Sequence, residues 1–259
     1  MKADLQATGA DSGASLSQRA DALEHRMMEE LDQVIVRSVL FTSGDRDPTL
    51  PPERPALRPG QHFLMGDDPR LARMPERPTL LDFFRCRFAP INHLLQSAAL
   101  ALRAGHEEKV VLACLLHDIA VSGFIRADHG YWGAQLVEPY VEEEVSWAIR
   151  AHQALRFFPD PAVGYEYPEA YIRNFGRDYE PEPYIKEEYE RARNHRWYMT
   201  ARYITINDIY AFDPNARVNI DEFIDIIGRN FRQPKEGLGF DNSPVAHMWR
   251  TIWRPTRYL

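Results

Sequence analysis

Six residues of the types that most often bind metal ions are spread over the middle and later parts of the sequence. They are four histidines and two aspartates: His93, His117, Asp118, His129, His152 and Asp208. Neutral imidazole together with carboxylate suits zinc, iron, manganese or nickel. The adjacent His117 and Asp118 cannot easily bind one ion from the end of a helix, but a carboxylate between two ions can bridge them while its neighbour binds one. The six residues therefore predict a site for two metal ions.

The sequence around these residues is apolar, which is unusual for ionisable side chains. His117 and Asp118 come at the end of the run VVLACLLHDIA, and His152 and Asp208 each lie on an apolar helical stripe. Burying a carboxylate or an imidazole without a partner costs several kcal/mol. For any one histidine, a hydrogen bond to a backbone carbonyl in the core would be a sufficient explanation. The whole set favours metal coordination.

The elements that must position these side chains are helices. From about residue 78 the apolar residues follow helical periodicity, which predicts helices over 91–102, 107–120, from about 131, and over 141–152, 185–210, 220–227 and 244–253. Gly105 should end the first of them, and the second is apolar on every side, as a central buried helix should be. No convincing run of alternating strand residues occurs, so the sequence predicts an all-α fold.

The first 80 residues differ from the rest in composition. Residues 15–41 predict a charged amphipathic helix, and the following TSGDRDPTLPPERPALRPGQ predicts an extended linker or arm. We therefore divide the chain into an N-terminal helix with a proline-rich arm, residues 1–80, and a metal-binding domain, residues 81–259. Within that domain, the proline- and tyrosine-rich residues 157–184 are expected to form an ordered loop.

Composition and charge describe the class of protein. The chain has 259 residues, of which 44% are hydrophobic, and a formal net charge of -7. This negative charge does not favour binding to nucleic acid or to an anionic membrane. No window reaches the roughly 18 uncharged apolar residues of a membrane span, and the first residues lack the apolar core of a signal peptide. Cys86 and Cys114 are too few for a disulfide framework. We expect a cytoplasmic protein with a small-molecule substrate, and a homodimer as a further possibility.

The order of the six ligands resembles that of the HD-domain superfamily, whose all-helical core holds its metals with a central His-Asp doublet. The resemblance covers about residues 88–215, and the text ADHGYWGAQL around His129 is similar to that of dinuclear members. It implies a helical bundle around a dinuclear site. One metal would be bound by His93, His117, Asp118 and Asp208, with Asp118 bridging to a second metal held by His129 and His152.

Two short stretches resemble the diiron oxygenases of this superfamily, of the organophosphonate oxygenase and myo-inositol oxygenase type. HLLQSA, beginning at His93, is similar to their HxxQ(S/T)A, which implies that Gln96 orients a ligand or an oxygen species; a surface amide is the alternative. HQALRFF, beginning at His152, is similar to HxxAKRYL, in which a cation holds the anionic group of the substrate, and Arg156 would fill that place. Val121 stands where phosphohydrolases have a lysine.

The sequence also departs from the oxygenase pattern. LDFFRCRFAPINH contains Phe83 and Phe84 but no tyrosine, whereas some organophosphonate oxygenases have a gating tyrosine in this loop. The segment GYEYPEAYIRNFGRDYEPEPY replaces their serine-rich anion-binding segment, which indicates a different substrate. Arg85 and Arg87 could steer an anion into the site or pair with surface carboxylates. The tryptophans of the C-terminal tail are expected to pack on the domain.

We therefore expect a mixed-valent diiron oxygenase that uses O2 to oxidise or cleave a small polar, anionic metabolite. Its cofactors would be two iron ions, Fe(II) and Fe(III), with O2 as co-substrate; manganese or zinc are alternative metals. Asp118 and Gln96 are the expected catalytic residues, and Arg156 and Arg87 the expected substrate-binding residues. One alternative is a dinuclear metal-dependent phosphohydrolase with the same ligands. Another is a catalytically silent HD protein that binds a ligand or partner through its N-terminal helix.

Overall fold

The described part of the chain is built from helices. The computed structural model describes residues 72–88, 91–122, 128–168, 172, 176–209, 211, 213 and 216–253. Its α-helices are α2 (Leu80–Cys86), α3 (Ile91–Arg103), α4 (Glu108–Leu116), α5 (His129–Val137), α6 (Glu143–Leu155), α8 (Pro183–Arg193), α9 (Tyr198–Asp208), α10 (Ile224–Asn230) and α11 (Ala246–Trp253). Within these residues the β-type pairing is a single bridge between Asp160 and Tyr165. The predicted all-α fold is confirmed, whereas the predicted helix over 15–41 and the proline-rich arm lie outside the described residues.

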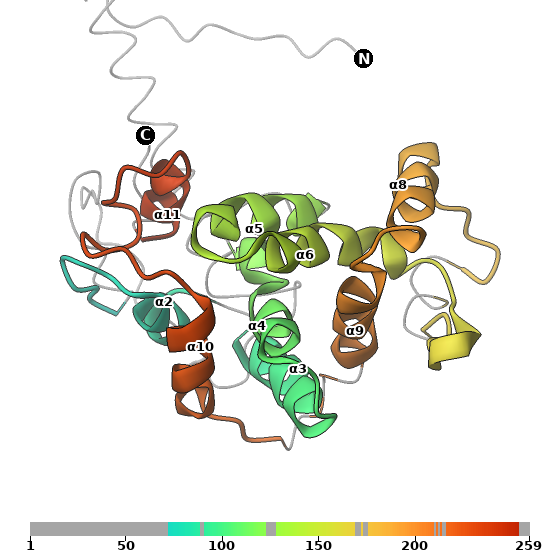
Figure 1. The fold of residues 1–259 in the computed structure, drawn as a ribbon, viewed down its shortest axis with the longest axis horizontal. Coiled ribbons are helices and arrows are strands. Elements are labelled where there is room, and N and C mark those ends of the chain that lie inside the picture. The colour runs from blue at the N-terminus through green and yellow to red at the C-terminus, as the bar shows by residue number, and fades with distance from the viewer. Residues whose placement is uncertain are drawn as a thin grey trace, which may run out of the picture.

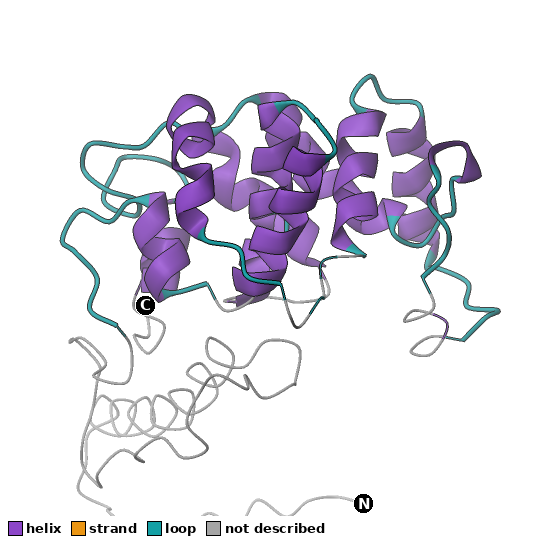
Figure 2. Cartoon of the chain, turned by 90° about the horizontal axis from the view of Figure 1, so that it is seen from below, coloured by secondary structure: helices purple, strands orange, loops and turns teal. Residues whose placement is uncertain are grey.

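Helix α4 lies at the centre of the fold, as its apolar sequence predicts. All of its residues from Val110 to Leu116 are buried. It packs against α3, α6, α9 and α10, and α5 packs on α6 (Figure 1). Seen from below, the helices stand side by side with loops joining their ends (Figure 2). The end of α4 is thus surrounded by other helices, and this is where His117 and Asp118 follow.

Gly105 ends α3 as the sequence predicts. It has a φ of +74°, which lies in the left-handed region that favours glycine. Its N–H donates to the carbonyl of Leu102, and the N–H of His106 donates to that of Ala101. This pair of hydrogen bonds is the Schellman arrangement, which satisfies the carbonyls at the end of a helix. The turn sends the chain directly back through the core as α4.

The prediction of one long helix over 185–210 is wrong, because two helices occupy this range. Helix α8 ends at Arg193 and α9 begins at Tyr198. Between them, the Asn194 side chain donates to the Glu190 carbonyl, and the His195 ring stacks on Trp147 at 4.0 Å between centroids. Side-chain bonds of asparagine to the backbone compete with helix continuation. The helical periodicity is similar on both sides of the break, so the pattern alone does not reveal it.

The C-terminal helix closes the core on the side of α2, as expected for the tryptophan-rich tail. Trp249 is fully buried, and its indole N–H donates to the Leu136 carbonyl at the end of α5. Its ring meets Phe83 edge to face at 4.8 Å. Phe83 and Phe84 are thus core residues of α2. Both cysteines are free thiols, as predicted.

None of the described helices has both the length and the apolar character that crossing a membrane would require.

Gly237 offers a test of how the loop before α11 is held to α2. It has a φ of +92°, and a Cβ there would lie 2.6 Å from the Arg77 Cα. Gly164 has a φ of +76° but open space around its Cα, so it carries the conformational cost without the clash. We expect Gly164→Ala to cost about 1–2 kcal/mol of unfolding free energy and Gly237→Ala clearly more. Thermal denaturation checks this, and equal losses for the two variants would contradict it.

Candidate metal centre

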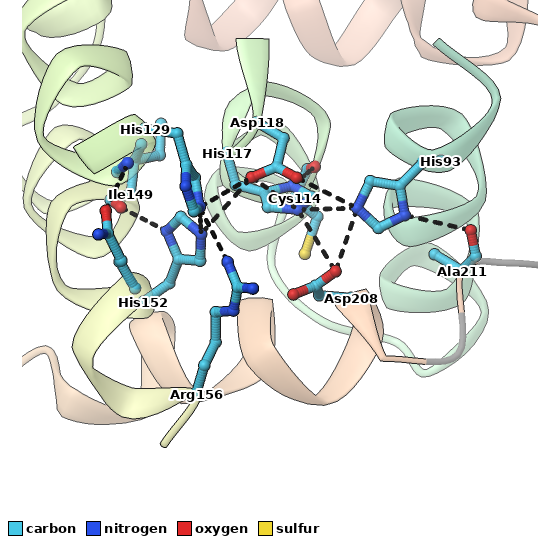
Figure 3. A network of polar contacts seen from close by, with 12 residues as sticks. His93, Cys114, His117, Asp118, His129, Ile149, His152, Arg156, Asp208 and Ala211 are labelled. Atoms are coloured by element: carbon cyan, nitrogen blue, oxygen red, sulfur yellow. Dashed lines mark hydrogen bonds and ion pairs between the residues drawn. The ribbon is translucent and has the colours of Figure 1, made fainter. Parts of the chain in front are cut away.

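The six predicted ligands come together from five parts of the fold (Figure 3). His93 comes from α3, His117 and Asp118 from the end of α4, His129 from the start of α5, His152 from α6 and Asp208 from the end of α9. His117 and His152 have no exposed surface, and the other four are buried or nearly so. The cluster is therefore part of the core, as the apolar sequence around it predicts.

Three of the side chains form a first group at one end of the cluster. His93 Nε2 lies 3.2 Å from His117 Nε2 and 3.1 Å from Asp208 Oδ1. His117 Nε2 lies 3.8 Å from the same oxygen. Ligands that each lie about 2.1 Å from one ion are about 3–3.5 Å apart. The three atoms therefore have a spacing suited to one ion.

His129 and His152 form a second group at the other end. Their Nε2 atoms are 3.2 Å apart. Asp118 Oδ1 lies 3.2 Å from His129 Nε2 and 3.7 Å from His152 Nε2. This group contains two imidazoles and an oxygen of Asp118, and has fewer ligands of its own than the first.

Asp118 lies between the two groups. Its Oδ2 is 3.6 Å from His93 Nε2, and its Oδ1 is 3.6 Å from His117 Nε2 and faces the second group as well. Oδ1 is buried, yet it makes no hydrogen bond. A buried carboxylate oxygen without a partner is costly, and three imidazole nitrogens around it form a donor set that a metal ion would complete. The residues therefore fit the dinuclear arrangement in which Asp118 bridges.

Backbone carbonyls orient three of the four imidazoles. The Nδ1 atoms of His93, His117 and His152 lie 3.1, 2.7 and 2.5 Å from the carbonyls of Ala211, Cys114 and Ile149. An Nδ1–H that donates to a carbonyl leaves the Nε2 lone pair available, which is the usual arrangement of metal-binding histidines. The hydrogen bond expected of a core histidine and the role of metal ligand thus belong to different nitrogens of the same ring.

The charges within the cluster are strongly coupled. Burial alone would lower the pKa of His93, but the carboxylates of Asp118 and Asp208 outweigh it and raise this pKa to about 10. Burial would raise the pKa of both carboxyl groups, but the surrounding imidazoles hold each well below its usual range. The pKa of His152 is lowered, mainly by burial. Both carboxylates are therefore ionised at neutral pH, and the site favours added positive charge.

Arg156 lies at the second group, where the sequence analysis expected a cation. It follows the last residue of α6, and its Nη1 lies 3.0 Å from His129 Nε2. Figure 3 shows its side chain reaching toward His129 and His152. The structure thus brings this predicted substrate-binding residue to the cluster.

Gln96 makes its hydrogen bonds to the backbone rather than to the six ligands, and its expected catalytic role stays a prediction. Its amide nitrogen donates to the Asp213 carbonyl at 3.0 Å, and its amide oxygen accepts from the Asp213 N–H at 2.9 Å. Both ends of the amide are engaged by the backbone of the segment after α9. Gln96 therefore fixes this segment to α3, and the sequence could not show it because the partner is backbone.

Arg87 is likewise bound to backbone groups, and its expected substrate-binding role stays a prediction. It is buried, and its guanidinium donates to the carbonyls of Trp253, Ala72 and Cys86. These bonds hold the chain before α2 and the end of α11. Arg85 pairs with Asp221 at 2.9 Å, in agreement with the alternative of a surface ion pair.

Two residues that were not predicted from the sequence fix the end of α6 next to the cluster. Arg202, on α9, is fully buried and donates to the carbonyls of Leu155 and Phe158. Tyr165 donates its hydroxyl proton to the Arg156 carbonyl at 2.8 Å. One feature of the sequence could have pointed to Arg202: it lies in the same predicted helix as the expected metal ligand Asp208.

These features define an all-α protein with a buried histidine and aspartate cluster that could hold metal ions. Residues 91–188 match the family model described as HD domain. This match supports a similarity of these residues to the HD-domain superfamily, and the matched range contains every residue of the cluster except Asp208. No curated protein matches the sequence.

Removing one ligand of the second group should reduce the number of ions bound. At saturating metal we expect the unaltered chain to bind about two ions and His129→Ala about one, because the first group keeps its own ligands. His195→Ala is the matched control, since His195 stacks on Trp147 outside the cluster. Elemental analysis after removal of excess metal checks the count. Two ions in His129→Ala would contradict the assignment of the second group.

Proposed function

We propose that the protein is a diiron oxygenase that uses dioxygen to oxidise or cleave a small polar, anionic metabolite. The observation that carries this proposal is the position of Asp118, whose two carboxylate oxygens face two groups of imidazoles. The imidazole and carboxylate ligands suit iron. The match to the HD domain supports a metal-dependent activity in general.

The two groups of ligands differ in a way that supports a division of tasks. His93, His117 and Asp208 would hold the first ion together with Asp118. His129 and His152 would hold the second ion, and the cationic Arg156 lies beside them, where it could bind an anionic substrate. An Fe(II)/Fe(III) pair bound by these residues would supply one-electron chemistry and sites for dioxygen and substrate.

The chain's own residues would prepare this chemistry in three ways. The carbonyl partners of His93, His117 and His152 fix the orientation of the rings before any ligand arrives. The burial of the cluster limits access of water. Arg156, next to His129, would bind the anionic group of the substrate, because a guanidinium can donate two parallel hydrogen bonds to a carboxylate or phosphonate.

A dinuclear phosphohydrolase is the second candidate, and the same geometry supports it. Imidazole and carboxylate ligands also suit manganese and zinc, which can activate a water molecule. Arg156 could bind a phosphate as well as another anion. Turnover of phosphoesters with manganese, independent of oxygen, would favour this candidate. In both cases a small molecule is the proposed partner, while a homodimer stays a prediction.

Low-temperature EPR separates the two candidates. Protein loaded with iron without oxygen and then partially oxidised should give a coupled mixed-valent signal from about two irons per chain. Small anionic metabolites that bind at the site should perturb it. His129→Ala should lose the coupled signal and retain one from isolated ferric iron. One tightly bound manganese or zinc pair, with no coupled iron signal, would contradict the oxygenase and lead to phosphohydrolase assays.

A further inference from the structure

The contact between Arg156 and His129 involves the nitrogen that would bind the second metal ion. Arg156 Nη1 lies 3.0 Å from His129 Nε2. The same Nε2 lies 3.2 Å from His152 Nε2 and 3.2 Å from Asp118 Oδ1. The His129 Nε2 atom can accept a hydrogen bond from a guanidinium N–H only with its lone pair, which is the same lone pair that would bind a metal ion. Arg156 and the second ion therefore compete for one atom.

Charge adds to this competition. The guanidinium of Arg156 is always protonated, and a divalent ion held by His129 and His152 would lie a few ångströms from it. Like charges at such a distance repel strongly where water is scarce. The arginine thus favours the second position without its metal.

The backbone of Arg156 is fixed, so only its side chain can leave. Its carbonyl accepts the hydroxyl proton of Tyr165, and its N–H donates to the His152 carbonyl at 3.2 Å. Arg202, itself fully buried, holds the neighbouring carbonyl of Leu155. A change of rotamer would carry the guanidinium away from His129, provided that another acceptor takes its protons. An anion is the natural acceptor, since charged hydrogen bonds to guanidinium are strong.

We propose that Arg156 controls the filling of the second metal position. In the metal-free protein its guanidinium holds His129 Nε2, and an anionic ligand that draws the guanidinium away allows the second ion to bind. The inference rests on the proposed function only in taking the dinuclear site as given. Its consequence is ordered loading: the position formed by His93, His117 and Asp208 fills first, and the second fills when the anion is present.

The test is a titration of the metal-free full-length chain with Mn(II) alone, and with sulfate or acetate against chloride at equal ionic strength. For the unaltered chain we expect one tight ion and a second that binds about tenfold or more weakly, with the second tightened by sulfate or acetate. Arg156→Ala should bind the second ion about tenfold more tightly, with no response to the anion. Calorimetry gives both affinities, and EPR of the Mn(II) pair reports that the second ion lies beside the first.

Two further variants make the comparison specific. Arg156→Gln keeps a long side chain with an amide donor but removes the charge, so its second affinity should lie between those of the unaltered chain and Arg156→Ala. Arg150→Ala is the matched control, because Arg150 is an exposed cation of the same helix that lies over the Tyr131 ring. It should behave like the unaltered chain. An unchanged first affinity in every variant verifies that the fold is intact.

The outcomes separate this inference from the proposed function. If Arg156→Ala binds the second ion no more tightly, or more weakly, the inference is overturned while the dinuclear site stands. If neither protein binds a second ion at saturating Mn(II), both the inference and the dinuclear site fail. If the second ion responds to Arg156 and to anions as expected but the iron-loaded protein gives no coupled mixed-valent signal, the oxygenase proposal alone fails.

Discussion

The burial of the Asp118 carboxylate among four imidazoles is the interaction on which the rest of the site depends. A carboxylate removed from water must be surrounded by positive charge or by hydrogen-bond donors, and Asp118 Oδ1 has no hydrogen bond of its own. Its neighbours are instead ring nitrogens that come from α3, the end of α4, α5 and α6. The four segments must therefore meet at one point, and a central helix that is apolar on every side is the element that allows them to do so.

The backbone supplies the precision that the side chains alone would lack. Each of three imidazoles is held by a carbonyl, two of them within the same turn of the helix that carries the ring: Cys114 for His117 and Ile149 for His152. Such local bonds set the ring orientation as soon as the helix forms. The end of α6 is fixed in a similar way by Arg202 and Tyr165, so that the cationic side chain beside the second group starts from a defined point.

The sequence predicted those parts of the structure that depend on local pattern and residue type. Apolar periodicity and Gly105 predicted α3, α4 and the turn between them, and residue type predicted that six distant ligands would meet. The sequence did not reveal interactions in which a side chain binds a backbone group or a residue far along the chain. Gln96 and Arg87 are polar residues near the first ligand, yet both bind backbone groups that no motif encodes. The break between α8 and α9 depends on Asn194 and on the stacking of His195 on a distant tryptophan.

The pairing of α3 with the segment after α9 has a consequence for when the site can form during synthesis. His93 and Gln96 lie one turn apart on α3, and they hold the backbone of Ala211 and Asp213. The first ligand of the chain therefore obtains its orientation from residues made more than a hundred positions later, next to the last ligand, Asp208. A nascent chain that has emerged from the ribosome only through α6 already contains five of the six ligands, but its His93 ring lacks this partner. Completion of α9 and the segment after it, rather than the arrival of the His-Asp doublet, is the step that makes the cluster whole.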